Sequence, residues 1–177
     1  MRQFAVSAIG RDRPGIVAGL TRTLLEHGVN IEDSQMSILR GHFSMMLLVS
    51  APDDVDAQQL RQDLSHTGDE LGLEALSVGE VSVEQAGQAR SSHVITVYGA
   101  DHPGILHSLS ASLSQLGVNI VDLTTRLVGD DDAVYVAVLE VQVPEGLDDA
   151  NLEAKVRDAA EHERVEVSIR GAGYDAL

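Results

Sequence analysis

The sequence predicts an α+β protein built from two copies of one domain, each with the element order βαββαβ. A long segment near the start of the chain returns in closely similar form about half a chain later. In both copies, β-rich runs alternate with segments whose apolar residues recur at spacings of three and four, which indicates amphipathic helices. Glycine and proline separate these runs, as is typical of turns between elements.

The repeat relates GRDRPGIVAGLTRTLLEHGVNIED (10–33) to GADHPGILHSLSASLSQLGVNIVD (99–122), at a constant separation in the chain. Solenoid repeats run to about 20–50 residues, and this period is longer, so the pattern indicates a duplicated domain. The predicted units are domain 1 (1–84), a small, polar, glycine-containing linker (85–92) and domain 2 (93–177).

In the first copy, a β-rich run at 3–9 precedes a predicted helix at 14–27, whose apolar residues fall on one face. Gly28 stands where a helix-ending glycine belongs, and a second strand covers 29–39. Because aliphatic residues flank the asparagine at its start, we expect this strand to be buried. The equivalent elements of the second copy are 93–99, 103–116, Gly117 and 118–128.

Turn residues at 40–42 and 129–132 each precede a third strand. Acidic residues then open a second helix, which suits the helix macrodipole. These residues are Asp53, Asp54 and Asp56 in one copy and Asp148 and Asp149 in the other; the third strands are 43–50 and 133–143, and the last strands lie near 74–84 and 163–170. The order βαββαβ, found twice, predicts two ferredoxin-like domains, each an antiparallel sheet with both helices on one face.

Composition excludes several functions. The net charge of −16 and the isolated Lys155 argue against direct binding to nucleic acid, which needs a basic patch. The chain has no cysteine, so disulfides, thiolate metal sites and cysteine nucleophiles are excluded. No run approaches the ~20 apolar residues of a membrane span, and the start of the chain is a poor signal peptide. We expect a cytoplasmic protein with no membrane association.

The loop Asp-x-Pro-Gly-Ile, which joins the first strand to the first helix of each copy, is a candidate anion site. Pro14 fixes φ and fits a first helical turn, and Gly15 leaves the backbone uncovered. The N–H groups of a first turn have no helical partners, so a carboxylate is a natural guest. The alternative is structural, because Asp12 could simply cap the helix.

The asparagine of Gly-Val-Asn-Ile is the second candidate. Asn30 and Asn119 could stabilise a turn at strand entry. An amide is also both donor and acceptor, so it could read the ammonium and carboxylate groups of a zwitterion.

The Asp-x-Pro-Gly-Ile loop, the amphipathic helix and the Gly-Val-Asn-Ile strand, on a βαββαβ frame, resemble the ACT domain. The resemblance covers nearly the whole chain as two tandem copies, and such short tandem chains resemble the glycine cleavage system transcriptional repressor family. It implies that an effector, usually an amino acid, binds between two domains, with the loop of one domain and the asparagine of its partner in contact with it. The implied ligand-binding residues are Asp12, Arg13, Pro14, Gly15, Ile16, Asn30, Ile31, Asp101, His102, Pro103, Gly104, Ile105, Asn119 and Ile120.

This interpretation predicts a non-enzymatic regulator that forms a homodimer and acts on a regulator protein, with no cofactor, metal or catalytic residue. One alternative is a ligand-free interaction module. A less favoured one is a small acylphosphatase-like hydrolase, for which Arg11 and Arg13 offer a phosphate contact that the second copy lacks. His102 and His107 are the nearest pair of possible metal ligands. They are five residues apart, which does not place them on one helix face, so no metal site is expected there.

Two further groups have structural interpretations. The aspartates at 130–132 lack the rest of a calcium loop, so a solvated hairpin tip is expected. Met36, Met45 and Met46 are expected to fill the core or an interface.

Overall fold

The computed structural model describes residues 1–82, 92–129 and 133–171 of the chain. The chain divides into two compact units, Met1–Gln85 and Ala86–Leu177. Most of the predicted linker at 85–92, and the aspartates at 130–132, lie outside the described residues. No helix within the described part of the chain is long and apolar enough to cross a membrane.

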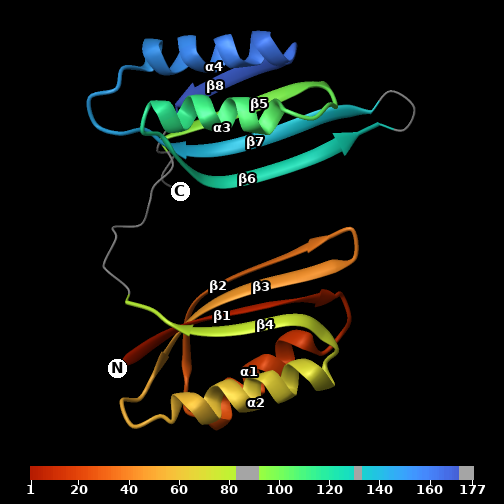
Figure 1. Ribbon diagram of the computed structural model, residues 1–177, viewed down its shortest axis with the longest axis vertical. Helices are drawn as coiled ribbons and strands as arrows, with labels where there is room; N and C mark the ends of the chain where they lie inside the picture. Colours follow the sequence, from red (N-terminus) through yellow and green to blue (C-terminus); the bar gives the residue numbers. More distant parts are fainter. Residues whose placement is uncertain (83–91, 130–132, 172–177) are drawn as a thin grey trace, which may run out of the picture. The chain divides into compact units, whose positions relative to one another are not determined.

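The first unit contains four strands and two helices in the predicted order. They are β1 (Arg2–Arg11), α1 (Ile16–Glu26), β2 (Asn30–Leu39), β3 (His42–Ala51), α2 (Ala57–Glu70) and β4 (Leu73–Glu80). The strands form one antiparallel sheet in the order β2-β3-β1-β4, and both helices cover the same face (Figure 1).

The second unit repeats this architecture. Its elements are β5 (His93–Ala100), α3 (Ile105–Gln115), β6 (Asn119–Val128), β7 (Val134–Gln142), α4 (Asp149–Glu163) and β8 (Glu166–Gly171). Its sheet order, β6-β7-β5-β8, is equivalent to that of the first unit. The predicted fold, two ferredoxin-like βαββαβ domains, is therefore confirmed.

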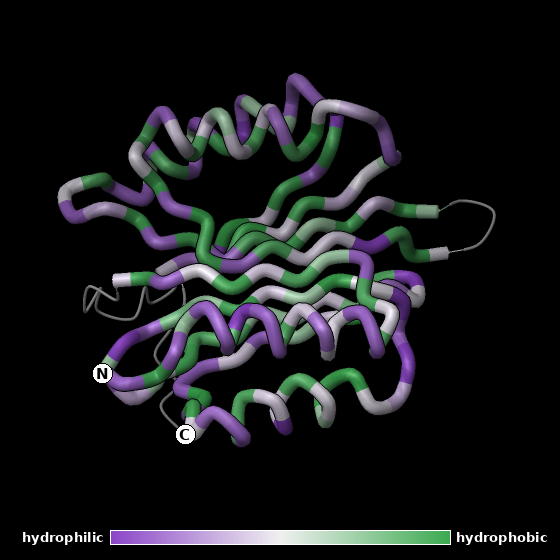
Figure 2. The backbone as a smooth tube through the Cα atoms, turned by 60° about the horizontal axis from the view of Figure 1, so that its bottom comes forward, coloured by the Kyte–Doolittle hydropathy of each residue, from purple (hydrophilic) through white to green (hydrophobic). Residues whose placement is uncertain are grey.

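Each unit has its own aliphatic core between the sheet and the helices. In the first, Leu20 and Leu24 from α1 and Leu60 and Leu64 from α2 are almost fully buried against the sheet. Hydrophobic residues recur along the strands of both sheets, while the helices alternate between hydrophobic and hydrophilic stretches (Figure 2). The four-residue spacing that predicted the helices therefore also predicted the buried face.

The first helix of each unit ends at the predicted glycine. Gly28 has φ 65°, its N–H donates to the Leu25 carbonyl over 2.9 Å, and the Val29 N–H donates to the Leu24 carbonyl over 3.0 Å. This pair of bonds is a Schellman motif, with Val29 and Leu24 both buried. Gly117 ends α3 in the same way.

The predicted start of these helices is wrong. Both prolines precede the helix, which begins after Gly15 and Gly104 in the left-handed region, with φ 98° and 115°. Neither α1 nor α3 receives a side-chain cap, so Asp12 does not cap as the sequence suggested. The second helices differ, because the Asp56 carboxylate accepts from the N–H groups of two residues in the first turn of α2.

The expectation of a buried second strand is also wrong. Val29 is only 7% exposed, but it precedes β2, and all ten residues of β2 are exposed. Ile31 is 36% exposed. The reason is the strand order: β2 and β6 are edge strands, whereas the central strands β1 and β3 carry most of the sheet's contribution to the core.

Candidate functional site

The loop between β1 and α1 presents backbone donors that no side chain occupies. The Asp12 N–H donates to the Gly41 carbonyl over 2.9 Å, which fixes the start of the loop against the β2–β3 turn. The first helical hydrogen bond is from the Gly19 N–H to the Gly15 carbonyl, at 2.8 Å. The N–H groups of Ile16 and Val17 therefore precede the helical ladder, and the macrodipole makes this end attractive to a carboxylate.

A pocket of about 470 Å³ lies where this loop meets the sheet. Its floor is formed by Met36 of β2 and Phe43 of β3. Five predicted site residues line it. The full lining is Asp12, Arg13, Pro14, Gly15, Ile16, Val17, Ala18, Met36 and Phe43.

Asn30 lies at the far end of the sheet from the loop of its own domain. It faces Ser50 near the end of β3, whereas the loop begins after Arg11, which faces His42 at the start of β3. At about 3.3 Å per residue, the separation along β3 is on the order of 25 Å. Asn119 occupies the equivalent place in the second sheet. A single domain therefore does not bring the loop and the asparagine together.

A β-bulge follows the asparagine in both edge strands. The register of β2 shifts between Ile31 and Asp33, and that of β6 shifts between Ile120 and Asp122. Bulges bend a strand and re-aim its side chains, and they are common beside functional sites. The bulge was not predicted, although the sequence marks its place by the repeated Asn-Ile pair followed two residues later by aspartate.

Arg13 and His102, the equivalent residues of the two loops, contact the second helix of their own domain. Arg13 Nη2 donates to the Glu70 carbonyl oxygen over 3.3 Å, and His102 Nε2 lies 2.7 Å from the Glu163 carbonyl oxygen. Glu70 and Glu163 are the last residues of α2 and α4. A cation at this end interacts favourably with the helix macrodipole.

The surroundings of His102 favour its charged form. Nδ1 lies 3.1 Å from the Pro103 carbonyl oxygen, so both ring nitrogens face acceptors, and only an imidazolium donates to both. These hydrogen bonds, to Pro103 and then to Glu163, raise the pKa of His102 above its usual 6.5, and the negative charges of Glu163 and Asp101 add to the effect. The Glu163 carboxylate lies 3.7 Å from Nδ1.

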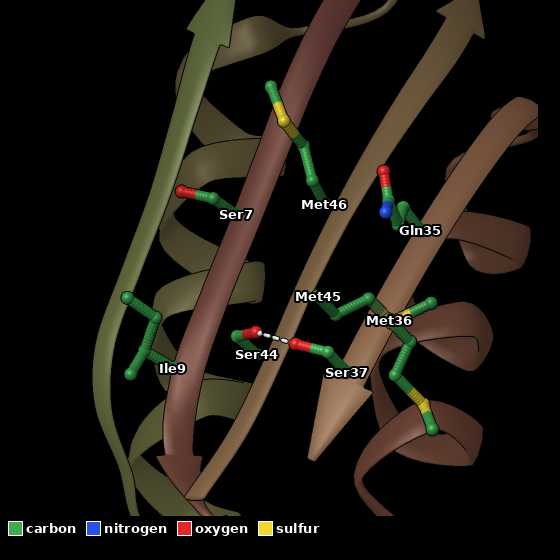
Figure 3. A pocket seen from close by; sticks show the side chains of 8 residues that line it. All are labelled: Ser7, Ile9, Gln35, Met36, Ser37, Ser44, Met45 and Met46. Carbon is green, nitrogen blue, oxygen red and sulfur yellow. Dashed lines mark hydrogen bonds between the residues drawn. The ribbon is translucent and has the colours of Figure 1, made fainter. Parts of the chain in front are cut away.

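A second, smaller hollow of about 290 Å³ lies on the face of the first sheet that the helices leave uncovered (Figure 3). Ser37 and Ser44 share a hydrogen bond of 2.8 Å across it, between their Oγ atoms. All the side chains that line it are uncharged: Ser7, Ile9, Gln35, Met36, Ser37, Ser44, Met45 and Met46. None of the predicted site residues lies here. Met46 is 59% exposed, so it does not fill the core of its domain.

Among the residues that the structure describes, no group of three or more His, Asp or Glu side chains is placed to hold a metal ion.

The fold and the two loops define a class of protein: tandem βαββαβ domains, each with a first helix that receives no side-chain cap and an exposed edge strand. The ACT domain model matches residues 2–77 and 92–170, so the chain belongs to the ACT-domain family.

Several kinds of protein are similar to this chain. The glycine cleavage system transcriptional repressor of Escherichia coli is 27% identical over 97% of this chain and 90% of its own length. A UPF0237 protein from Methanopyrus kandleri is 44% identical over 43% of this chain and 86% of its own length. The phosphoserine phosphatase SerB2 of Mycobacterium tuberculosis is 30% identical over 95% of this chain, which spans only 40% of the phosphatase.

Solved structures agree with the fold. A protein from Galdieria sulphuraria superposes with a TM-score of 0.79 at 25% identity, covering 97% of this chain and 98% of that protein. A candidate glycine cleavage system transcriptional repressor superposes with a TM-score of 0.74 at 18% identity, covering 96% of each chain, which supports the fold alone.

Proposed function

We propose that this protein is a non-enzymatic cytoplasmic regulator whose ACT domains bind an amino acid and control a partner protein or transcriptional regulator. The observation that carries the proposal is the loop pocket, in which free first-turn N–H groups stand above an apolar floor. The carboxylate of an amino acid would accept from these N–H groups, and its side chain would occupy the floor.

The site would be completed by a second domain. The loop and the asparagine of one domain lie at opposite ends of its sheet, so antiparallel pairing of two edge strands would place each asparagine beside the other domain's loop. The Asn30 amide could then accept from the ammonium group of the ligand or donate to its carboxylate. The same reasoning applies to Asn119.

The edge strands support such pairing. Met36, Ile38 and Leu39 of β2 and Leu123 and Leu127 of β6 are between 44% and 69% exposed. A long, exposed edge with apolar side chains is a template for pairing with another strand. We therefore propose a homodimer, in which strand pairing covers these side chains.

The glycine cleavage repressor relative supports a role in transcriptional regulation through a protein partner, since the net charge of −16 disfavours direct contact with DNA. A ligand-free interaction module remains the second candidate, which the exposed edge strands favour equally. The hydrolase alternative loses support, because Arg13 is hydrogen-bonded to its own second helix rather than directed at a phosphate cradle.

Thermal unfolding with each of the twenty amino acids at millimolar concentration tests the proposal. A true ligand at 100 times its Kd stabilises the folded state by roughly 2.7 kcal/mol. The Asn30→Ala/Asn119→Ala variant should lose most of this stabilisation.

Asn151→Ala is a matched control, because Asn151 lies on α4 and makes its capping bond through its backbone N–H. If no amino acid stabilises the protein while it still binds a regulator, the ligand-free module is the better description.

A further inference from the structure

The loop pocket of the first domain and the equivalent place in the second domain share their loop residues but differ in the residues around them. The Asp, Pro, Gly and Ile of the loop are identical in both domains. Four apolar residues complete the first pocket: Val17, Ala18, Met36 and Phe43. The equivalent of Val17 is the apolar Leu106, but those of the other three are His107, Thr125 and Tyr135, whose side chains form hydrogen bonds.

The strand registers establish these equivalences. Phe43 and Tyr135 each face the glycine just before the last residue of the central strand of their sheet. Met36 and Thr125 stand two residues before the partners of Phe43 and Tyr135 on the edge strands, so they lie on the same, helix-covered side. Phe43 and Tyr135, and Met36 and Thr125, therefore occupy equivalent places in the two domains.

The floors have different chemistry. Phe43 is 2% exposed and Met36 is half exposed, so the first floor offers only apolar contacts. In the second, the Tyr135 hydroxyl interacts with the Thr125 hydroxyl and lies within the field of Asp101 in the loop. Burial, and after it the charge of Asp101, raise the pKa of Tyr135, so its hydroxyl stays protonated and available as a donor.

We propose that the two sites select different amino acids: the first an apolar side chain, and the second a side chain bearing a hydroxyl or amide group. The inference rests on the proposed function, because it requires the loop pocket to hold the effector. Met36 and Phe43, and Thr125 and Tyr135, are then the specificity-determining residues.

The two preferences should differ in strength. An apolar pocket rejects an added hydroxyl by only about 100-fold, whereas a site built to hydrogen-bond a hydroxyl rejects the analogue without it by about 10⁴–10⁵-fold. The bond between the Tyr135 and Thr125 hydroxyls uses one of their two O–H donors, so an apolar ligand leaves the other donor without a partner, whereas the first floor has no such donor. The second site is therefore expected to be the more discriminating one.

L-Valine and L-threonine are the probes, because they have nearly the same shape and differ by a methyl and a hydroxyl group. Titration of the ¹⁵N-labelled full chain, followed at the Gly15 and Gly104 amides, reports on each site separately. Gly15 should respond at the lower concentration to valine, and Gly104 should respond to threonine at a concentration at least 10-fold lower than to valine.

The Thr125→Val/Tyr135→Phe variant removes both hydroxyls of the second floor without changing its volume. It should abolish the threonine preference at Gly104 and leave Gly15 unchanged. Thr124→Val/Tyr98→Phe is the matched control, since it makes the same changes on the opposite face of the same sheet and should preserve both preferences.

The outcomes separate the two proposals. If no amino acid shifts either glycine, the effector-binding function fails. If valine and threonine shift both glycines with the same preference, or if the control variant loses the preference as fully as the floor variant, the effector site stands and the difference in specificity is overturned.

Discussion

The His102 imidazole lies 2.7 Å from the carbonyl oxygen of Glu163, at the place where the first domain has Arg13 bound to Glu70. Both contacts join a loop pocket to the last turn of the second helix. An arginine is charged at every accessible pH, but a histidine is charged only below its pKa. The positive charge at this contact is therefore titratable in the second domain, where a histidine replaces the arginine.

The contribution of His102 to the stability of the second domain should fall as pH rises above about 6.5. The pKa of His102 is raised by folding, so its contribution is fully present below the unfolded value of about 6.5 and is lost as pH rises through the folded value. An NMR titration of the His102 ring should give a pKa above 6.5. The His102→Arg variant should remove this part of the pH dependence, and a His102 pKa at or below 6.5 would contradict the assignment.

Leu24 and Leu25 are adjacent on α1 but differ in burial, at 1% and 74% exposed. Leu24→Ala should lower the free energy of unfolding by about 2–5 kcal/mol, because it leaves a cavity in the first core. Leu25→Ala serves as the control and should change it by less than about 0.5 kcal/mol. Chemical denaturation measures both, and equal effects would show that α1 packs through another face.

The aspartates before the helices should fall into two groups. Asp56→Ala and Asp148→Ala remove carboxylates that accept from first-turn N–H groups, and each should cost about 0.5–2 kcal/mol of stability. Asp12→Ala and Asp101→Ala remove no cap and should cost less. If the loop aspartates matter for the effector, their replacement should weaken binding instead, which calorimetry would detect.

Charge on the edge strands should reduce self-association. Ile38→Lys and Leu127→Lys place a cation on exposed positions of β2 and β6, where pairing would have to desolvate it. Sedimentation at increasing concentration should show a weaker dimer. Ala75→Lys on β4, the opposite edge of the first sheet, is the control and should leave the association unchanged.

The sequence was sufficient to predict the fold because each helix and strand of the domain is marked twice, once in each repeat. The spacing of Leu20 and Leu24, and the glycine that ends each first helix, are local signals that packing left intact. The start of α1 was misplaced because a proline next to a glycine reads as a helix start, whereas the left-handed glycine sets the boundary. Helix boundaries depend on such local backbone geometry.

Features that depend on strand order could not be read from the chain. An aliphatic strand is normally a buried one, and only the order β2-β3-β1-β4 shows that β2 stands at the edge. The polar floor of the second pocket was hidden for another reason. The β6–β7 connection is longer than the β2–β3 turn, so the equivalence of Phe43 and Tyr135 requires the strand pairing to establish it.

In each domain, a hydrogen bond joins the loop before the first helix to the last residue of the second helix, and this has a mechanical consequence. A loop that shifts when a ligand arrives must either break its hydrogen bond to the Glu70 or Glu163 carbonyl or draw the end of that helix along with it. Ligand binding at the start of the first helix would thus displace the C-terminal end of the second helix. In the second domain, the extent of that displacement would depend on a single proton.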